Sequence, residues 1–160
     1  MKVLWVDEEQ NSLRIEILRA KARGWDMSLV EHVAGTLEMI EATRYDALVC
    51  DIILPADSFQ CAAKFCDPEN GYHLIETIRN PNRCGSTPSN VPILVVTADA
   101  DAPLRLARYL TDVPPFVLLR KPVHEEAVTE AFRKLEEYCH PLREINDSSA
   151  LSGNLGASPL

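Results

Sequence analysis

Four short apolar runs in this chain each end in residues that could do chemistry. Asp7 and Glu8 follow the first run, Asp51 the second, Thr97 closes the third and Lys121 follows the fourth. Apolar runs without polar alternation are typical of parallel strands buried on both faces. In an open α/β sheet the carboxyl ends of such strands form the edge where ligands bind. If the runs are neighbouring strands, three carboxylates, one hydroxyl and one ammonium meet at one edge.

The rest of the chain alternates strand and helix patterns. Strands are expected at 2–7, 28–33, 45–51, 92–97 and 115–120, and helices at 10–23, 36–43, 71–79, 102–110 and 124–138. Five strand–helix repeats require right-handed crossovers and a parallel sheet covered on both faces. The predicted fold class is therefore α/β, with one domain over 1–139 that contains a long inserted loop at 55–70. Residues 140–160 are expected to form a flexible tail or linker.

Composition excludes several classes of protein. The net charge of −8 argues against binding nucleic acid through this domain. No apolar run approaches the length needed to cross a bilayer, and the N-terminal run becomes charged too soon for a signal peptide. An odd number of cysteines, five, without a signal peptide predicts free thiols in place of a disulfide framework. We therefore expect a cytoplasmic domain with no membrane contact.

The polar residues at the strand ends carry a resemblance to a known family. The matching marks, each at the end of its own strand, are Asp7-Glu8, Asp51 with Pro55, Thr97-Ala98 and Lys121-Pro122. In this order and spacing the chain resembles, over residues 2–139, the receiver domain of bacterial two-component response regulators, such as the chemotaxis receiver. The resemblance implies a flavodoxin-like, doubly wound sheet of five parallel strands in the order 2-1-3-4-5, with helices on both faces.

The resemblance also implies that Asp51 accepts a phosphoryl group. A carboxylate can attack phosphorus and form an aspartyl-phosphate, while a cation and Lys121 neutralise the charge on the transferring group. Converging carboxylates about 4 Å apart repel by roughly 4 kcal/mol, so they need a counter-ion, and Mg²⁺ suits oxygen ligands beside phosphate. By the resemblance, Glu8, Asp51 and the backbone carbonyl of Ile53 bind Mg²⁺, or Mn²⁺ in its place. Asp7 acts largely through a bound water.

Residues around the acceptor have implied roles as well. Thr97 is expected to donate its hydroxyl to a phosphate oxygen, and the small side chain of Ala98 leaves the approach open. The peptide bond before Pro122 is expected to be cis. Ile53 and Asp99 occupy positions that tune hydrolysis of the phosphoryl group in such domains. Because Ile53 is bulky and apolar, we expect it to hinder an attacking water and to prolong the phosphoryl state.

The predicted function is a phosphorylation-dependent switch in a two-component system or phosphorelay. A histidine kinase or phosphotransfer protein would supply the phosphoryl group, and the chain would catalyse only its own Mg²⁺-dependent phosphorylation and dephosphorylation. The switch would act on the face formed by the fourth helix, fifth strand and fifth helix, through which a homodimer is also expected. Its output is either a downstream protein target or a C-terminal output domain of a longer chain. Leu118 stands where many such domains carry Tyr or Phe, so the output coupling is not implied by the resemblance.

Three alternatives stay open at this point. A phosphorylation-independent, receiver-like interaction module would keep the fold without chemistry at Asp51. A Mg²⁺-dependent phosphatase with an aspartyl nucleophile would typically carry a second acid two residues later, where this chain has Ile53. A zinc site is the third, although its candidate ligands lack the paired spacing of known zinc sites. Those candidates are Cys61, Cys66, His73 and Cys84. The 55–70 loop is more simply explained as a lid or a partner surface.

Overall fold

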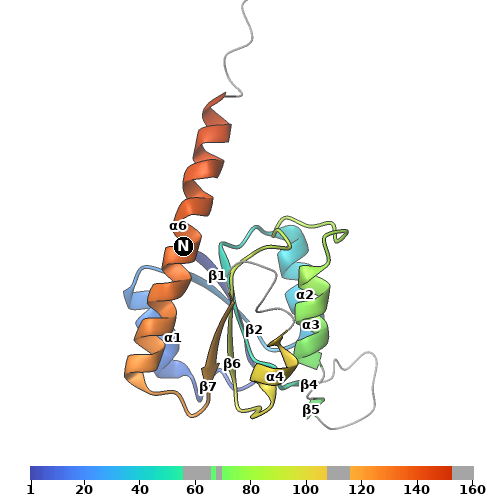
Figure 1. Cartoon of the computed structure of the whole chain (residues 1–160), viewed down its shortest axis with the longest axis vertical. Helices are drawn as coiled ribbons and strands as arrows, with labels where there is room; N and C mark the ends of the chain where they lie inside the picture. Colours follow the sequence, from blue (N-terminus) through green and yellow to red (C-terminus); the bar gives the residue numbers. More distant parts are fainter. Residues whose placement is uncertain (56–65, 68–69, 108–115, 153–160) are drawn as a thin grey trace, which may run out of the picture.

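A parallel sheet lies between two layers of helices in the computed structural model, which describes residues 1–55, 66–67, 70–107 and 116–152 (Figure 1). Five strands run parallel in the order β2-β1-β3-β6-β7. They are β1 (Lys2–Val6), β2 (Asp26–Val30), β3 (Ala47–Cys50), β6 (Ile93–Thr97) and β7 (Phe116–Arg120). Numbered along the chain, these parallel strands have the order 2-1-3-4-5. The predicted fold class and strand order are confirmed.

Helices cover both faces of the sheet, as the strand–helix alternation predicts. They are α1 (Arg14–Ala22), α2 (Val33–Ala42), α3 (Asn70–Arg79), the short α4 (Ala102–Arg105) and α6 (Glu125–Ser152). Helices α1 and α6 lie on one face, and α2 and α3 lie on the other (Figure 1). No helix in the described part of the chain combines the length and the apolar character that a membrane span needs.

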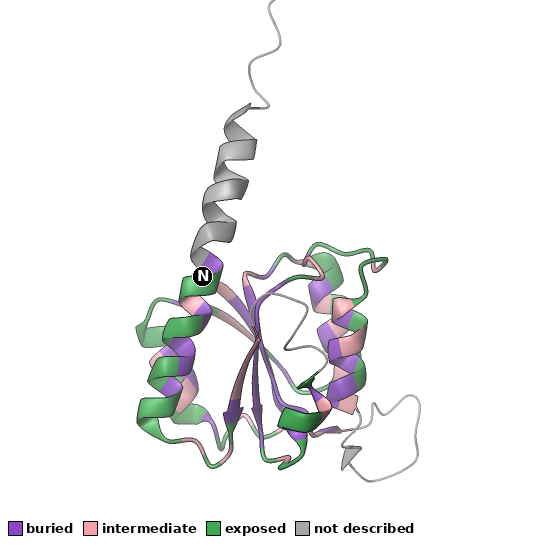
Figure 2. Cartoon of the chain, viewed as in Figure 1, coloured by how far each residue is buried: buried purple, intermediate pink, exposed green. Residues whose placement is uncertain are grey.

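Alternate residues of each strand lie on opposite faces of the sheet and pack into two separate hydrophobic cores. In β1, Leu4 and Val6 pack with residues of α2 and α3, whereas Val3 and Trp5 pack with residues of α1 and α6. The Trp5 ring meets the Phe132 ring of α6 edge-on, with centroids 6.3 Å apart. Figure 2 shows buried residues along the strands and on the inward sides of the helices. The strands lack polar alternation because both faces are covered.

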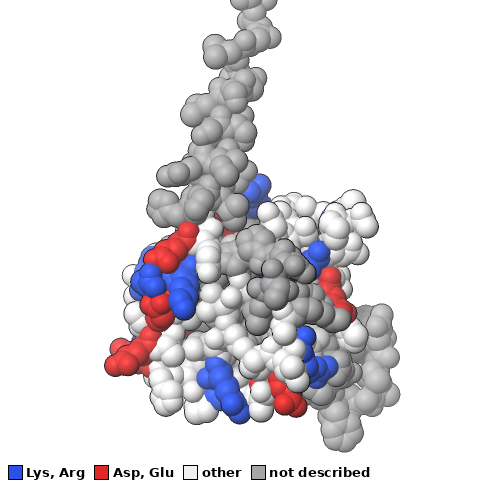
Figure 3. All heavy atoms as spheres, in the orientation of Figure 1, with Lys and Arg blue, Asp and Glu red and all other residues white. Residues whose placement is uncertain are grey.

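Charged residues lie on the outer face of α6 (Figure 3). Arg133 pairs with Glu130 at 2.7 Å and also with Glu137, as expected for a solvated helix face. Glu136 is different, because it accepts hydrogen bonds from Arg23 Nε and Trp25 Nε1, both at 2.8 Å. Those bonds lower the pKa of Glu136, Arg23 contributing most, and they fasten α6 to the segment between α1 and β2.

Several element bounds differ from the expectations by a few residues: β2 spans Asp26–Val30 where we expected 28–33, and α1 and α2 begin at Arg14 and Val33 where we expected 10 and 36. Two larger features also differ. A short antiparallel ribbon of β4 (Leu54–Pro55) and β5 (Cys66–Asp67) closes the base of the inserted loop. Helix α6 continues to Ser152, whereas we expected it to end at residue 138 and a flexible tail to begin at 140. Its last turns extend beyond the sheet (Figure 1), where a helix needs no apolar stripe, so the periodicity ends before the helix does. The domain boundary at 139 stays a prediction.

Some expectations fall on residues that the structure does not describe. They concern Cys61 and the interior of the inserted loop, the end of the helix expected at 102–110, and the tail beyond residue 152. These expectations lie outside the described residues and stay predictions.

Candidate functional site

The carboxyl ends of four neighbouring strands bring the predicted residues to one edge of the sheet. Strand β3 pairs with β1 on one side and β6 on the other, and Cys50 is the register partner of both Val6 and Val95. Asp7 and Asp51 therefore follow adjacent strands at the same level. Thr97 is the last residue of β6, opposite Arg120 of β7, so that Lys121 follows directly. Strand register alone thus places these residues at the same edge.

The ammonium group of Lys121 lies between two carboxylates. Its Nζ atom is 2.6 Å from Asp51 Oδ2 and 3.0 Å from Asp7 Oδ2. The Asp7 side chain is fully buried, and the Asp51 side chain is only 6% exposed. These ion pairs join residues that lie 114 and 70 positions apart in the sequence. The predicted convergence of Asp7, Asp51 and Lys121 is present in the structure.

Backbone donors fix the orientation of both carboxylates. Asp51 Oδ1 accepts a hydrogen bond from the Ile53 N–H at 3.0 Å, and Asp7 Oδ1 accepts one from the Glu9 N–H at 2.7 Å. Each carboxylate bonds to the backbone two residues further on, as aspartates in turns commonly do. Each acid therefore uses one oxygen to hold its loop and directs the other oxygen to Lys121.

Burial and charge act in opposite directions on these groups. Burial raises the pKa of Asp7, and the bonds from Lys121 and Glu9 offset only part of that effect. Burial by itself would lower the pKa of Lys121, but the hydrogen bonds and negative charges of Asp51 and Asp7 outweigh it and raise the pKa. The ammonium is therefore charged at neutral pH, and it is the main group that opposes the rise in the pKa of Asp7.

The neighbouring cysteine is not a second nucleophile. Cys50 is fully buried, and its thiol donates a hydrogen bond to the Asp51 carbonyl oxygen at 3.0 Å. Burial raises the pKa of this thiol far above its usual value, and the nearby charges of Asp51 and Asp7 add to the effect. A thiol held protonated is inert, so the reactive oxygens of the site are those of its carboxylates.

Thr97 lies beside this cluster, held by its backbone and by its side chain. It is 1% exposed, and its carbonyl oxygen accepts a hydrogen bond from the Lys121 N–H at 2.8 Å. Its Oγ1 accepts one from the Asp99 N–H at 3.2 Å. The peptide bond between Lys121 and Pro122 is cis, as the resemblance implies.

Sequence reasoning missed two residues at the start of α3. Gly71 donates its N–H to the Ile52 carbonyl at 2.9 Å, and a Cβ atom at this glycine would lie only 2.3 Å from Ile52 Cα. Tyr72 donates its hydroxyl to Asp99 Oδ2 at 2.8 Å. A glycine where a helix begins after a long loop could have suggested close approach to the backbone. Nothing in the sequence links Tyr72 to a residue 27 positions away.

The oxygen-rich donor set suits Mg²⁺ better than zinc. Among the described residues no three His, Cys, Asp or Glu side chains converge closely enough to hold a metal by themselves. Mg²⁺ is usually held by one or two carboxylates and several waters, so Asp51, the half-buried Glu8 and the Ile53 carbonyl are a fitting set. For the zinc alternative, the His73 ring pairs with Glu76 at 3.4 Å, and Cys84 is a free, exposed thiol. Neither belongs to a metal cluster within the described ranges.

Comparison with known proteins gives matches among solved structures. No protein-family model matches the chain, and no curated protein does. A receiver domain of an HD domain-containing protein from Pseudomonas fluorescens Pf-5 is similar, with a TM-score of 0.65 and 16% identity over 88% of this chain and 97% of that one. The chain has the receiver-domain fold. A chemotaxis response regulator of Vibrio cholerae has a TM-score of 0.61 and 15% identity, over 84% of this chain and 97% of that one.

A third similar structure bears on the metal. It is the receiver domain of a sensor histidine kinase from Pseudomonas aeruginosa PAO1, with a TM-score of 0.62 and 20% identity over 87% of this chain and 97% of that one. That protein holds a magnesium ion coordinated in its active site cleft. At these identities the likeness shows the receiver fold alone.

Proposed function

We propose that this chain is a response-regulator receiver in which Asp51 accepts a phosphoryl group. The observation that carries the proposal is the Lys121 ammonium, 2.6 Å from Asp51 Oδ2, at the edge where Asp7 and Thr97 also lie. A cation in contact with the acceptor carboxylate is placed to neutralise charge on an arriving phosphoryl group. The receiver fold of the similar structures supports the same reading.

The proposed reaction is an in-line transfer from a phosphohistidine. A carboxylate oxygen of Asp51 attacks phosphorus, the bond between phosphorus and the histidine nitrogen breaks, and that nitrogen keeps the electron pair and takes a proton. Lys121 then pairs with a phosphoryl oxygen, and Thr97 donates its hydroxyl to another. When bound by Glu8, Asp51 and the Ile53 carbonyl, Mg²⁺ supplies further positive charge to the phosphoryl oxygens. The chain would catalyse only this transfer and the later hydrolysis.

The partner proposed as phosphoryl donor is a histidine kinase or phosphotransfer protein, and α1 offers a surface for it. Helix α1 begins soon after the loop that carries Asp7. Its residues Ile15 and Leu18 are 62% and 56% exposed and lie one turn apart on the helix, so that they can form one apolar patch. Leu18 also lines a hollow with Leu29, beside the basic Arg14 and Lys21. An apolar patch with a basic rim fits a helix that carries acidic residues.

On the output side we propose the face of α4, β7 and α6, where Leu104 of α4 is 80% exposed. This face would bind a downstream target, an output domain or a second copy of the chain. Measuring the molecular mass in solution before and after phosphorylation tests the homodimer directly. A mass that stays that of one chain in both states would exclude it.

Incubation with acetyl phosphate and Mg²⁺, followed by intact-mass measurement, tests the central proposal. We expect wild type to gain the mass of one phosphoryl group, and Asp51→Asn to gain none. Glu9→Gln is the matched control for loss of a nearby acid, because only the backbone N–H of Glu9 contacts the cluster. A wild-type chain that gains no mass, or an Asp51→Asn variant that gains as much as wild type, would contradict the proposal.

One observation favours a second function, that of a phosphorylation-independent interaction module. Lys121 already neutralises part of the charge on Asp7 and Asp51, so that the cluster is stabilised without a metal. This alternative would be supported if wild type stays unphosphorylated and if wild type and Asp51→Asn bind the partner with equal affinity.

A further inference from the structure

The first turn of α3 is attached to two different loops of the site. Gly71 donates its N–H to the Ile52 carbonyl at 2.9 Å, which joins α3 to the loop after β3. Its neighbour Tyr72 donates its hydroxyl to Asp99 Oδ2 at 2.8 Å, which joins α3 to the loop after β6. Gly71 and Tyr72 therefore connect the loop after β3, which follows Asp51, with the loop after β6, which follows Thr97.

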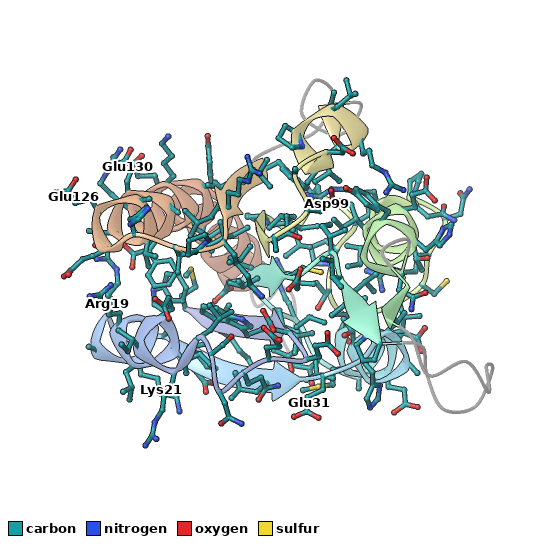
Figure 4. All side chains as sticks on the ribbon, turned by 90° about the horizontal axis from the view of Figure 1, so that it is seen from below. Arg19, Lys21, Glu31, Asp99, Glu126 and Glu130 are labelled. Carbon is teal, nitrogen blue, oxygen red and sulfur yellow. The ribbon has the colours of Figure 1, made fainter. Side chains whose placement is uncertain are left out.

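Side chains from two helices determine the position of Asp99. Besides the Tyr72 hydroxyl, Asp99 Oδ2 faces Arg105 Nη1 of α4 at 3.9 Å, and Asp99 Oδ1 accepts a hydrogen bond from the Asp101 N–H at 2.9 Å. The Arg105 guanidinium carbon lies 3.9 Å from the centre of the Tyr72 ring. Figure 4, which looks at the carboxyl ends of the strands, shows Asp99 on the side of the molecule where α3 and α4 lie.

Asp99 passes this constraint to the Thr97 side chain. The Asp99 N–H donates to Thr97 Oγ1 at 3.2 Å. A hydroxyl that accepts through a lone pair keeps its own proton, so Thr97 can still donate to a third group. The sheet holds the Thr97 backbone, since its carbonyl accepts a hydrogen bond from the Lys121 N–H. Within the described part of the chain, only the Asp99 bond orients its Oγ1.

We propose that Tyr72 is a positioning residue for Thr97. Its hydroxyl holds Asp99, and Asp99 holds the Thr97 hydroxyl in the orientation that receives a phosphoryl oxygen. Stacking of Arg105 on the Tyr72 ring extends the same connection to α4. The effect on phosphorylation rests on the proposed function, whereas the connection from Tyr72 to the Thr97 loop does not.

The connection is tested first without any phosphoryl chemistry. Tyr72→Phe removes the hydroxyl and keeps the ring under Arg105. We expect the backbone amide hydrogens of Asp99 and Asp101 to exchange with solvent about threefold to tenfold faster, the range that one net hydrogen bond is worth. Tyr45→Phe is the matched control, because Tyr45 is also buried and has a cation, Lys2 Nζ, 5.6 Å from its ring centre. Unchanged exchange in Tyr72→Phe, or an equal change in the control, would overturn the connection.

The functional consequence is tested by a double-mutant cycle on the rate of phosphorylation by acetyl phosphate. Tyr72→Phe should lower this rate about threefold to tenfold in wild type. In a Thr97→Ala background the same substitution should have no further effect, because Tyr72 acts through Thr97. A loss of equal size in both backgrounds, or no loss in either, would overturn the positioning role. If wild type accepts no phosphoryl group, the proposed function fails, and amide exchange decides the connection separately.

Discussion

Two clusters at the same edge of the sheet pair acids with bases in different ways. Asp7, Asp51 and Lys121 stand directly after strands, and both acids are almost completely buried. Tyr72, Asp99 and Arg105 stand on helices and a loop, and the Arg105 side chain is 34% exposed. Strand register positions the first cluster, whereas contacts between side chains position the second. The first should therefore be costly to alter and chemically reactive, and the second should be easier to alter and suited to adjusting the first.

The largest effect should follow removal of the shared ammonium. Lys121→Met leaves two buried carboxylates without their cation, so we expect a loss of about 3 kcal/mol in the free energy of unfolding at neutral pH. Chemical denaturation measures the loss, which should shrink toward acid pH because Asp7 can then be protonated. Lys134→Met, at an exposed pair with Glu130, is the control and should change stability far less, because solvent screens that pair. Equal effects of the two substitutions would remove the contrast between the clusters.

The next effect concerns Gly71, which attaches the first turn of α3 to the loop between the two clusters. Gly71→Ala should destabilise the fold by about 2 kcal/mol, because its Cβ would overlap the Ile52 backbone, which cannot rotate away as a side chain can. Gly24→Asn is the control at a glycine with φ of 81° and nothing within 4 Å of an added Cβ, and Asn tolerates this conformation. Thermal unfolding compares the two. A Gly71→Ala variant as stable as the control would show that α3 can move away from the loop after β3.

The pH dependence of stability should distinguish the buried acid. Because burial raises the pKa of Asp7 above its usual 3.8, its contribution to stability is fully present below about pH 3.8 and is lost as pH rises through the folded-state value. Asp7→Asn removes this titration and keeps an oxygen for the Glu9 N–H. The free energy of unfolding of the variant should therefore rise relative to that of wild type as pH increases from 3.8 toward neutrality. Denaturation at several pH values measures this difference. A constant difference in the free energy of unfolding between the two proteins over this range would contradict the effect of burial on the pKa of Asp7.

The smallest effect should come from the second cluster. Arg105→Gln removes a partly exposed ion pair and the cation over the Tyr72 ring, so we expect a loss of about 0.5 kcal/mol. The loss should decrease further at 1 M salt, which screens exposed charges. Denaturation at low and high salt measures it. A loss as large as that of Lys121→Met would show that both clusters are equally essential to the fold.

The sequence predicted the first cluster and not the second, for a physical reason. Asp7, Asp51, Thr97 and Lys121 each follow an apolar run, and parallel strands bring their carboxyl ends to one edge whatever the loops do. The Tyr72–Asp99 bond depends on where α3 packs against the sheet. The position of α3 cannot be predicted from the sequence, because a long inserted loop separates it from Asp51. The β4–β5 ribbon was missed for a related reason, since two-residue strands carry no periodicity. The predicted end of α6 at residue 138 was wrong, because a helix that continues beyond the sheet needs no apolar face and so leaves no periodic pattern in the sequence.

By itself the sequence determined the α/β class, the five parallel strands and the residues at their carboxyl ends, because short apolar runs indicate strands that are buried on both faces. It also determined which residues could carry charge at that edge. Only the tertiary structure decided that Lys121 contacts both acids, that Gly71 brings α3 against the loop after β3, and that Tyr72 reaches Asp99. These contacts depend on how helices pack against the sheet, and packing joins residues whose separation along the chain gives no sign that they will meet.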